Sequence, residues 1–332
     1  MIGRHLGTSV LAILVLALLA WGIALSGPLT YGLTMLLPYA ALAVFLAGFV
    51  YRIVQWGRIP VPFRITTTCG QQCSLPGIKS SPLESPAGIW GVIGRMALEV
   101  LLFRSLFRNA TVEIAERRPV YGSAKWLWFF ALLFHGSLLI IVLRHLRFFV
   151  EPIVPCVAAL SSLDGFFEIG IPTLYLSDAA LLAGLSFLFL RRVIGPRLRY
   201  ISLFTDYFAL LLIAGIATTG LLIRHLFPAD LLQVKNMALG WVTFSPAIPT
   251  GVGTVFYLHL CFVFVLLAWF PFSKLMHAGG IFLSPTRNLA NDNRAKRHVN
   301  PWNAPVKVHT YGEYEDEFRE KMKLAGLPVE KE

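Results

Sequence analysis

The chain has 332 residues, of which 56% are hydrophobic and only 14% are charged, and its mean hydropathy is +0.66. A water-soluble domain of this length needs far more polar surface, so the composition indicates a membrane protein. The net charge of +11 does not indicate nucleic-acid binding, because the basic residues lie between apolar runs and form no single patch interleaved with aromatic residues.

Six apolar runs are each near the ~20 residues that a membrane-spanning helix requires. In chain order they cover about Thr8–Leu25, Gly32–Tyr51, Trp126–Leu143, Leu174–Leu190, Leu203–Ile223 and Gly253–Met276. The first run follows Arg4 and His5 and could be a signal peptide. Its length and its weak small-residue pattern favour a retained anchor. The runs therefore predict six transmembrane helices.

Lysine and arginine set the expected orientation of these helices. Ten basic residues lie between the second and third runs and four between the fourth and fifth, so both connections should be cytoplasmic. The opposite loops, 148–172 and 227–250, contain four acidic residues against only Lys235. Both termini are therefore predicted to be cytoplasmic.

The long second connection and the tail have different compositions. Residues 57–88 are rich in Pro, Gly, Ser and Thr, which is typical of an irregular loop or a partner-binding surface. Ile89–Phe107 has the pattern of an amphipathic helix at the membrane surface. Residues 279–305 are polar, and Glu313–Leu324 alternates acids and bases like a short solvated helix. Such a tail either contacts a soluble subunit or is merely solvated.

Two histidines lie in each of two apolar runs, His135 and His145 in the third and His259 and His277 in the sixth. Ionisable side chains inside a membrane are rare and by default functional. The two runs should be antiparallel, which pairs His145 with His259 near the outside and His135 with His277 near the inside. A haem iron takes two axial ligands, so this arrangement favours two bis-histidine haems at different depths. An interhelical hydrogen bond, the usual role of one such histidine, is less favoured for four.

The two histidine pairs differ in spacing, ten residues from His135 to His145 and eighteen from His259 to His277. At ~1.5 Å and ~100° per residue, ten residues rise ~15 Å and end ~80° away, whereas eighteen rise ~27 Å and return to the same face. A tilt or kink must absorb the difference, and Pro271 is the expected place for it. His277, at or beyond the helix end, is thus the least secure ligand.

Other charged and thiol side chains are candidates for supporting roles. Haem propionates need cationic partners, and three arginines lie at the expected outer ends of the third and fifth helices: Arg144, Arg147 and Arg224. Interfacial snorkelling is an equally good explanation for each of them. His225 could accept a proton at an outer quinone pocket, although a structural role is favoured. Cys69 and Cys73 form a C-x3-C pair, a weak metal signal for which a structural-thiol role is favoured.

The histidine spacings resemble those of the dihaem cytochrome b (gamma) subunits of respiratory nitrate reductases, over about Ala124–His277. Three further stretches look like the DsrM family, the membrane cytochrome b subunits of the DsrMKJOP complex associated with dissimilatory sulfite reduction. They are TTTCGQQCSLPGIK (Thr66–Lys79), LRYISLFTDYF (Leu198–Phe208) and PFSKLMHAGGIFLSPTRNLANDNRAKRHVNPWN (Pro271–Asn303). This second resemblance covers nearly the whole chain.

The resemblance implies two b haems, with His135, His145, His259 and His277 as ligands, and menaquinol near the outer haem. It also implies a cytoplasmic iron–sulfur partner related to heterodisulfide reductase, together with other membrane and periplasmic cytochrome subunits of the complex. No quinone-contacting residue can be carried over. The leading hypothesis is therefore an inner-membrane subunit that transfers electrons between menaquinol or menaquinone and that partner in sulfite or sulfate metabolism. Whether the isolated chain is itself an enzyme stays open.

The expected fold is an all-α integral membrane protein whose last four transmembrane helices form a dihaem cytochrome b bundle, with a cytoplasmic loop and a C-terminal tail. The expected divisions are a two-helix membrane region, the loop with its amphipathic helix, the dihaem domain and the tail, at residues 1–56, 57–123, 124–278 and 279–332. The alternative is a transporter that uses the histidines as a proton relay or as metal ligands. That class should show more membrane acids near the histidines and inverted repeats, and neither is evident.

Overall fold

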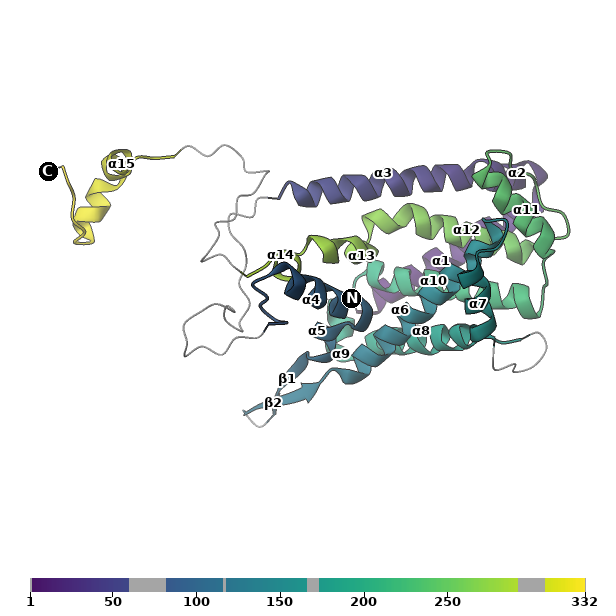
Figure 1. Ribbon diagram of the computed structural model, residues 1–332, viewed down its shortest axis with the longest axis horizontal. Coiled ribbons are helices and arrows are strands. Elements are labelled where there is room, and N and C mark those ends of the chain that lie inside the picture. Colours follow the sequence, from purple (N-terminus) through teal and green to yellow (C-terminus); the bar gives the residue numbers. More distant parts are fainter. Residues whose placement is uncertain (1, 60–81, 116–117, 166–172, 292–307, 332) are drawn as a thin grey trace.

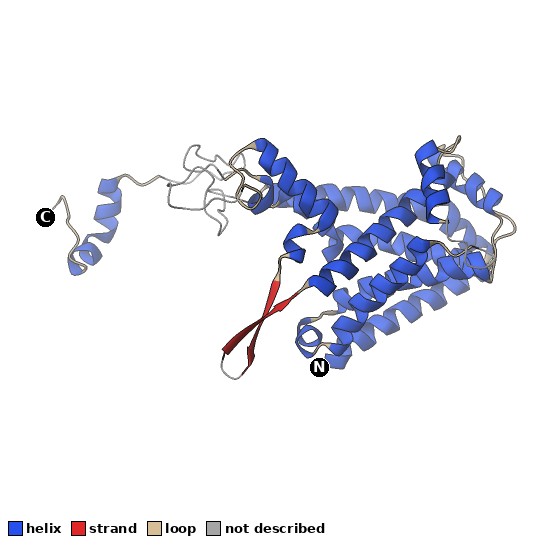
Figure 2. Ribbon diagram, turned by 60° about the horizontal axis from the view of Figure 1, so that its bottom comes forward, coloured by secondary structure: helices blue, strands red, loops and turns tan. Residues whose placement is uncertain are grey.

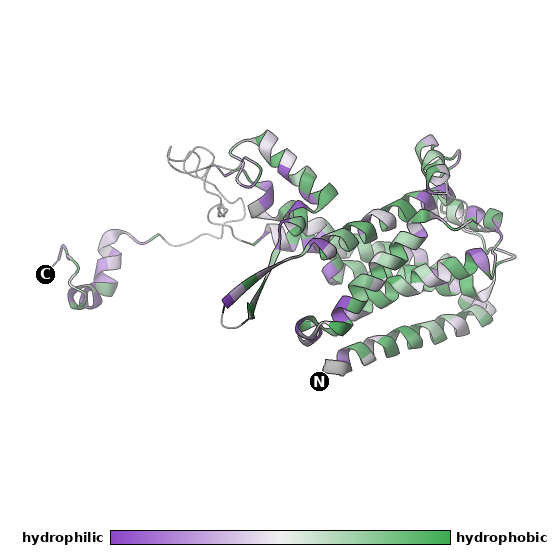
Figure 3. Ribbon diagram, turned by 90° about the horizontal axis from the view of Figure 1, so that it is seen from below, coloured by the Kyte–Doolittle hydropathy of each residue, from purple (hydrophilic) through white to green (hydrophobic). Residues whose placement is uncertain are grey.

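The computed structural model describes residues 2–59, 82–115, 118–165, 173–291 and 308–331. Long helices lie side by side, with α4, α5 and the hairpin at one end of the bundle and α7 and α11 at the other (Figure 1). The N-terminus lies at the same end as α4. Apolar residues follow the whole length of the bundle helices (Figure 3). This distribution suits a bundle surrounded by lipid.

Six long helices correspond to the six apolar runs. They are α1 (Ile2–Leu25), α3 (Leu37–Gly57), α6 (Lys125–His145), α8 (Leu176–Ile194), α10 (Phe204–His225) and α12 (Thr254–Trp269). Within the described residues, five segments are long and apolar enough to cross a membrane: Arg4–Leu25, Gly27–Gly57, Lys125–Phe148, Phe204–His225 and Thr254–Phe272. α8 is not among them; it has Asp178 in its first turn and Arg191 and Arg192 in its last. The all-α integral membrane fold predicted from the sequence is confirmed.

Shorter elements join these helices. The α-helices are α2 (Gly27–Met35), α4 (Ile89–Leu102), α5 (Arg104–Phe107), α7 (Pro155–Asp164), α9 (Pro196–Ile201), α11 (Leu231–Val242), α13 (His277–Gly280), α14 (Pro285–Asn288) and α15 (Tyr311–Leu324). The 3-10 helices are η1 (Leu146–Phe148), η2 (Phe270–Phe272), η3 (Lys274–Met276) and η4 (Ile281–Leu283). The strands β1 (Ala110–Ala115) and β2 (Arg118–Ser123) pair antiparallel, and Ala110 lies opposite Ser123.

Three parts of the fold differ from the expectations. The helix expected over Ile89–Phe107 is divided at Phe103, which has left-handed backbone (φ 49°) and ends α4. The hairpin that follows, which projects from the end of the bundle (Figure 2), was not expected. The two loops that were expected outside the membrane, 148–172 and 227–250, contain the short helices α7 and α11, whose apolar stretches are too short to span a membrane. The short tail helix is confirmed as α15, and Thr310 and Glu313 form a capping box at its start.

The helices pack in a defined order. α6 packs along α8, α8 along α10, and α10 along α12, while α1 fits against both α10 and α12 and α3 fits against α12. α6, which contains His135 and His145, and α12, which contains His259, are not among the helix pairs that pack closely. The α6–α8 contact is close because Gly184 of α8 lies against Phe134 of α6; a Cβ on this glycine would be 2.9 Å from the Phe134 Cβ. Small residues allow such approaches between membrane helices.

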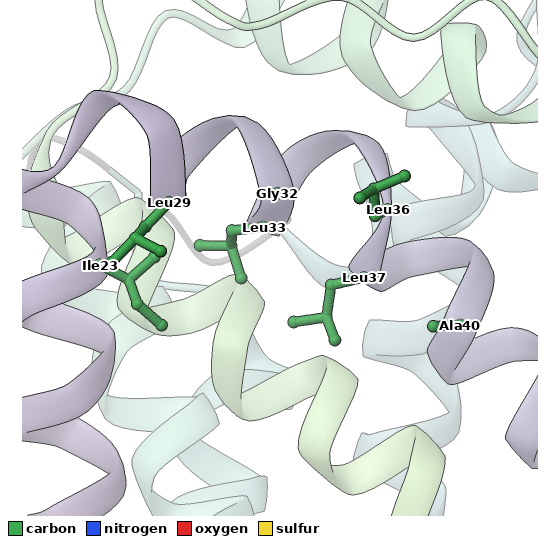
Figure 4. A pocket seen from close by; sticks show the side chains of 7 residues that line it. All are labelled: Ile23, Leu29, Gly32, Leu33, Leu36, Leu37 and Ala40. Carbon is green, nitrogen blue, oxygen red and sulfur yellow. The ribbon is translucent and has the colours of Figure 1, made fainter.

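The N-terminal helices form one wall of the bundle. Leu18 of α1 is 73% exposed, whereas Ala20 is fully buried, so α1 presents one face to the lipid and the other to the bundle. An apolar pocket of about 320 Å³ lies at the elbow between α1 and α3 (Figure 4). It is lined by Ile23, Leu29, Gly32, Leu33, Leu36, Leu37 and Ala40. These residues bring no polar side chain to orient a ligand, so the pocket is not the candidate site.

Candidate haem site

The structure brings the four histidines together in two pairs. The ring centres of His135 on α6 and His277 on α13 are 6.0 Å apart, and their ring planes are nearly perpendicular at 83°. His145, at the other end of α6, lies near His259 on α12, close enough for the two imidazoles to interact electrostatically. These are the pairs that antiparallel helices were expected to make.

The two histidines of α6 are oriented by their own helix. The Nδ1 atoms of His135 and His145 lie 2.7 Å from the carbonyl oxygens of Ala131 and Ile141, one turn earlier. A neutral imidazole that donates from Nδ1 presents the lone pair of Nε2, which is the state that a metal-ligating histidine needs. Across the described ranges, neither Nε2 has a hydrogen-bond partner.

The other two histidines are oriented by different contacts. The Nδ1 of His277 lies 2.7 Å from the carbonyl oxygen of Lys274 in η3. The Nδ1 of His259 lies 2.9 Å from the hydroxyl of Thr219 and 3.1 Å from the carbonyl oxygen of Ile216, both on α10. Because the Thr219 hydroxyl itself donates to an α10 carbonyl 2.7 Å away, its oxygen can accept the Nδ1 proton of His259. All four histidines can therefore adopt the same tautomer, in which Nδ1 is protonated and the lone pair of Nε2 is available to bind a metal.

The two histidine pairs fit a cofactor whose metal ion takes one imidazole from each side. A metal–imidazole bond is about 2.0–2.1 Å long and the ring centre lies roughly 1 Å beyond the nitrogen, so two imidazoles on one metal have ring centres about 6 Å apart. The 6.0 Å between His135 and His277 agrees with this value. In the part of the chain that the structure describes, no three His, Cys, Asp or Glu side chains converge as an all-protein metal site. Each pair could supply two nitrogens, and a haem would supply the other four.

The chain beyond α12 resolves the mismatch between the two spacings. α12 ends at Trp269, and the chain continues through η2 and η3 before His277 begins the four-residue helix α13. Pro271, at the expected kink, lies in η2 and is buried. Proline cannot extend an α-helix because it lacks the backbone N–H and its ring clashes with the preceding turn. His277 therefore lies beyond the regular helix.

Arg144, one of the three candidate propionate partners, already has an acidic partner. Its Nη1 lies 2.5 Å from Asp164 Oδ2 and 3.1 Å from Ser177 Oγ, and the arginine and the aspartate are both buried. Asp178 lies 3.9 Å away. The sequence placed Asp164 in a loop and gave it no role; it ends α7, and its only signal was an acid after an apolar stretch. Arg144 thus links α6 to α7 and α8 through a buried ion pair and a hydrogen bond.

The other two arginines have no such acidic partner within the described residues. Arg224 donates from Nε to the carbonyl oxygen of Thr173 at 2.8 Å, and its guanidinium lies 4.1 Å from the ring centre of Tyr175. Arg147 lies 4.9 Å from the ring centre of Phe148. Both side chains are partly buried, and both stay candidates for an anionic partner.

The remaining sequence candidates play a smaller part in this site. His225 is half-buried, and its Nε2 has no hydrogen-bond partner among the described residues. Cys69 and Cys73 lie outside the described residues. Thr219 was missed by sequence reasoning, because a buried threonine in an apolar helix looks like any other packing residue. Only the approach of α12 reveals its contact with His259.

Long apolar helices that bring histidines together in two pairs are typical of a membrane protein of the cytochrome b type. The chain belongs to the nitrate reductase gamma subunit family, whose family model matches residues 87–294. It is 44% identical over 275 residues to an Hdr-like menaquinol oxidoreductase cytochrome b-like subunit of Archaeoglobus fulgidus, covering 81% of this chain and 82% of the relative. A subunit of the same description from Archaeoglobus profundus is 43% identical over 273 residues, covering 80% and 81%. α1 to α3 precede the residues matched by the family model.

Proposed function

We propose that this chain is a haem b electron-transfer subunit of a menaquinol oxidoreductase complex. The observation that carries the proposal is the pair of opposed histidine sets, in which every Nδ1 is tied to a protein oxygen and Nε2 is left for a ligand. The relatives, described as subunits of an Hdr-like menaquinol oxidoreductase, support menaquinol as the electron donor or acceptor. A proton relay or metal transporter gains no comparable support.

In this proposal His145 and His259 hold an outer haem, and His135 and His277 hold an inner one. A bis-histidine haem supplies one-electron transfer and leaves no open position for substrate. The chain fixes each imidazole tautomer through Nδ1 and keeps α6 and α12 apart, while the apolar helices exclude water between the two depths. Arg147 and Arg224 are the proposed partners of the outer propionates, since the charge of Arg144 is already balanced by Asp164.

The proposed partners lie at the two ends of the bundle. Menaquinol would deliver electrons near His145 and His259, with its protons released outside. An iron–sulfur subunit related to heterodisulfide reductase would exchange electrons at the cytoplasmic end, where α4, the hairpin and the N-terminus lie. The DsrM-like stretches support a place in sulfite or sulfate metabolism, beside further membrane and periplasmic cytochrome subunits. Both termini are proposed to be cytoplasmic in an inner-membrane protein that acts only within this complex.

A haem count on the full chain tests the proposal. A pyridine haemochrome assay on the protein purified from membranes should give two b haems per chain. His145→Ala or His259→Ala should remove the outer haem only, and His135→Ala or His277→Ala the inner haem only. His225→Ala, the matched control, should keep both. Fewer than two haems in the parent chain, or loss of the same haem from both sets of variants, would contradict the proposal.

A further inference from the structure

α3 lies before the residues matched by the family model and packs against α12 with one face (Figure 1). Between positions 45 and 56, the buried or half-buried positions recur with helical period, and the positions between them are exposed. The inward face consists of Phe45, Gly48, Phe49, Arg52, Ile53 and Trp56. A helix face with this spacing packs against other parts of the protein. The segments that it contacts therefore indicate the role of α3.

The first partner of this face is the break at Pro271. A Cβ added to Gly48 would lie 2.8 Å from the Cβ of Pro271, so only glycine permits this approach. The rings of Phe45 and Phe270 meet edge to face with centres 5.6 Å apart. Arg52 donates from Nε to the carbonyl oxygen of Pro271 at 3.2 Å. The carbonyl groups at the end of a helix have no N–H donor within the helix, and Arg52 donates a hydrogen bond to one such carbonyl.

The second partner is α13, the short helix that begins with His277. A Cβ on Gly279 would lie 3.3 Å from Cζ of Phe49, and a Cβ on Gly280 would lie 3.3 Å from the Trp56 ring. The two glycines after the histidine therefore let the aromatic side chains of α3 reach the backbone of α13. The same face of α3 thus contacts the chain on both sides of η3.

A four-residue helix cannot keep its position by itself, because helix formation in so short a segment is unfavourable. The imidazole of His277 is exposed, so side-chain burial does not fix it either. Within the described part of the chain, its one hydrogen bond goes to Lys274, which belongs to the same irregular segment. The position of His277 relative to His135 must therefore come from what holds this segment, and α3 contacts it at Pro271, Gly279 and Gly280.

We propose that α3 is a brace that positions His277 for the inner haem, with Gly48 and Arg52 as positioning residues. The inference rests on the proposed function, because it takes His277 as an axial ligand. The proposal gives a role to a helix that lies outside the residues matched by the family model. It also predicts an effect confined to one haem, which a merely structural helix would not produce.

The experiment compares three variants of the full chain with a matched control. Gly48→Leu drives a side chain into Pro271, Arg52→Met removes the hydrogen bond without adding a branched volume, and Arg52→Lys retains a donor. Gly22→Leu on α1 is the control, because a Cβ at Gly22 has no atom within 4 Å. Haem content, low-spin EPR signals and redox titration are measured, and the inner haem is the signal that His277→Ala removes.

We expect Gly48→Leu to lose the inner haem signal and keep the outer one. Arg52→Met should change the inner reduction equilibrium about tenfold, which is ~59 mV for one electron, and Arg52→Lys should restore most of it. If Gly48→Leu does not accumulate in membranes, the inner-haem potential of Arg52→Met tests the brace instead. An inner haem that matches the Gly22→Leu control, or equal changes at both haems, would overturn the brace. If His277→Ala keeps two haems, the proposed function itself fails.

Discussion

His259 and His277 lie on one continuous stretch of chain but are held in place by different means. His259 lies within regular α12, and its Nδ1 contacts Thr219 and Ile216 on α10. His277 lies beyond the helix break, and among the described residues its imidazole bonds to Lys274 alone, in its own segment. The outer position is therefore fixed by a helix and a neighbouring hydroxyl. The inner position depends on how an irregular segment packs against α3.

The charged groups at the two ends differ in the same way. At the outer end, Arg144 and Asp164 form a buried ion pair. At the inner end, Lys274 lies 2.8 Å from Asp206; the aspartate is buried, but the lysine side chain is 67% exposed, and Asp206 also accepts a hydrogen bond from the backbone N–H of Leu203. A pair in which both charges are buried is costly to break, whereas an exposed partner such as Lys274 contributes less because water solvates it. Loss of Asp164 at the outer end should thus cost more than loss of Lys274 at the inner end.

The largest expected effect is at the outer end. Asp164→Ala removes the nearest acidic partner of the buried Arg144 cation and leaves only the more distant Asp178, which should destabilise the protein by about 3 kcal/mol. Thermal unfolding of the purified chain in detergent measures this. Glu151→Gln, which alters a pair with Lys235 whose glutamate is 61% exposed, is the control and should change little. If both variants unfold alike, the contrast between buried and exposed pairs is wrong.

An intermediate effect is expected at Thr219. Thr219→Val removes one hydrogen bond to His259 while Ile216 still offers its carbonyl, so the loss of stability should be about 1 kcal/mol. Since a hydrogen bond from Nδ1 raises the basicity of the ligand, its loss should raise the midpoint potential of the outer haem. Redox titration reads this shift. Thr219→Ser should restore the parent potential, and exposed Thr218→Val should have no effect; a shift of the inner haem would contradict the pairing.

The smallest effect is expected at the inner ion pair. Lys274→Met should cost about 1 kcal/mol, because the exposed ammonium is well solvated and the buried Asp206 keeps its hydrogen bond from the Leu203 N–H. The difference from the parent chain should shrink further at high salt, as screening weakens the pair. Unfolding midpoints at two salt concentrations check this. A loss as large as that of Asp164→Ala would show that both ends depend on charge equally.

Local pattern in the sequence was enough for the helices and for the identity of the candidate ligands. Six apolar runs predicted the six long helices, and the antiparallel alternation of the runs predicted which histidines face each other. Pro271 was expected to kink the sixth helix, and the structure goes further: α12 ends at Trp269, just before the proline. Hydropathy and backbone chemistry act within a few residues, so they can be read along the chain.

Only the tertiary structure decided what holds those histidines. Asp164 looked like a loop acid, Thr219 like a packing residue, and Gly48 and Arg52 like ordinary positions in an anchor helix. Their partners are distant in sequence: Thr219 contacts a histidine 40 residues away, and Arg52 bonds a carbonyl 219 residues away. Helical periodicity shows that a face is buried but not which segment covers it. That choice is made when the helices pack, and the packing brings α3 against the segment that carries His277.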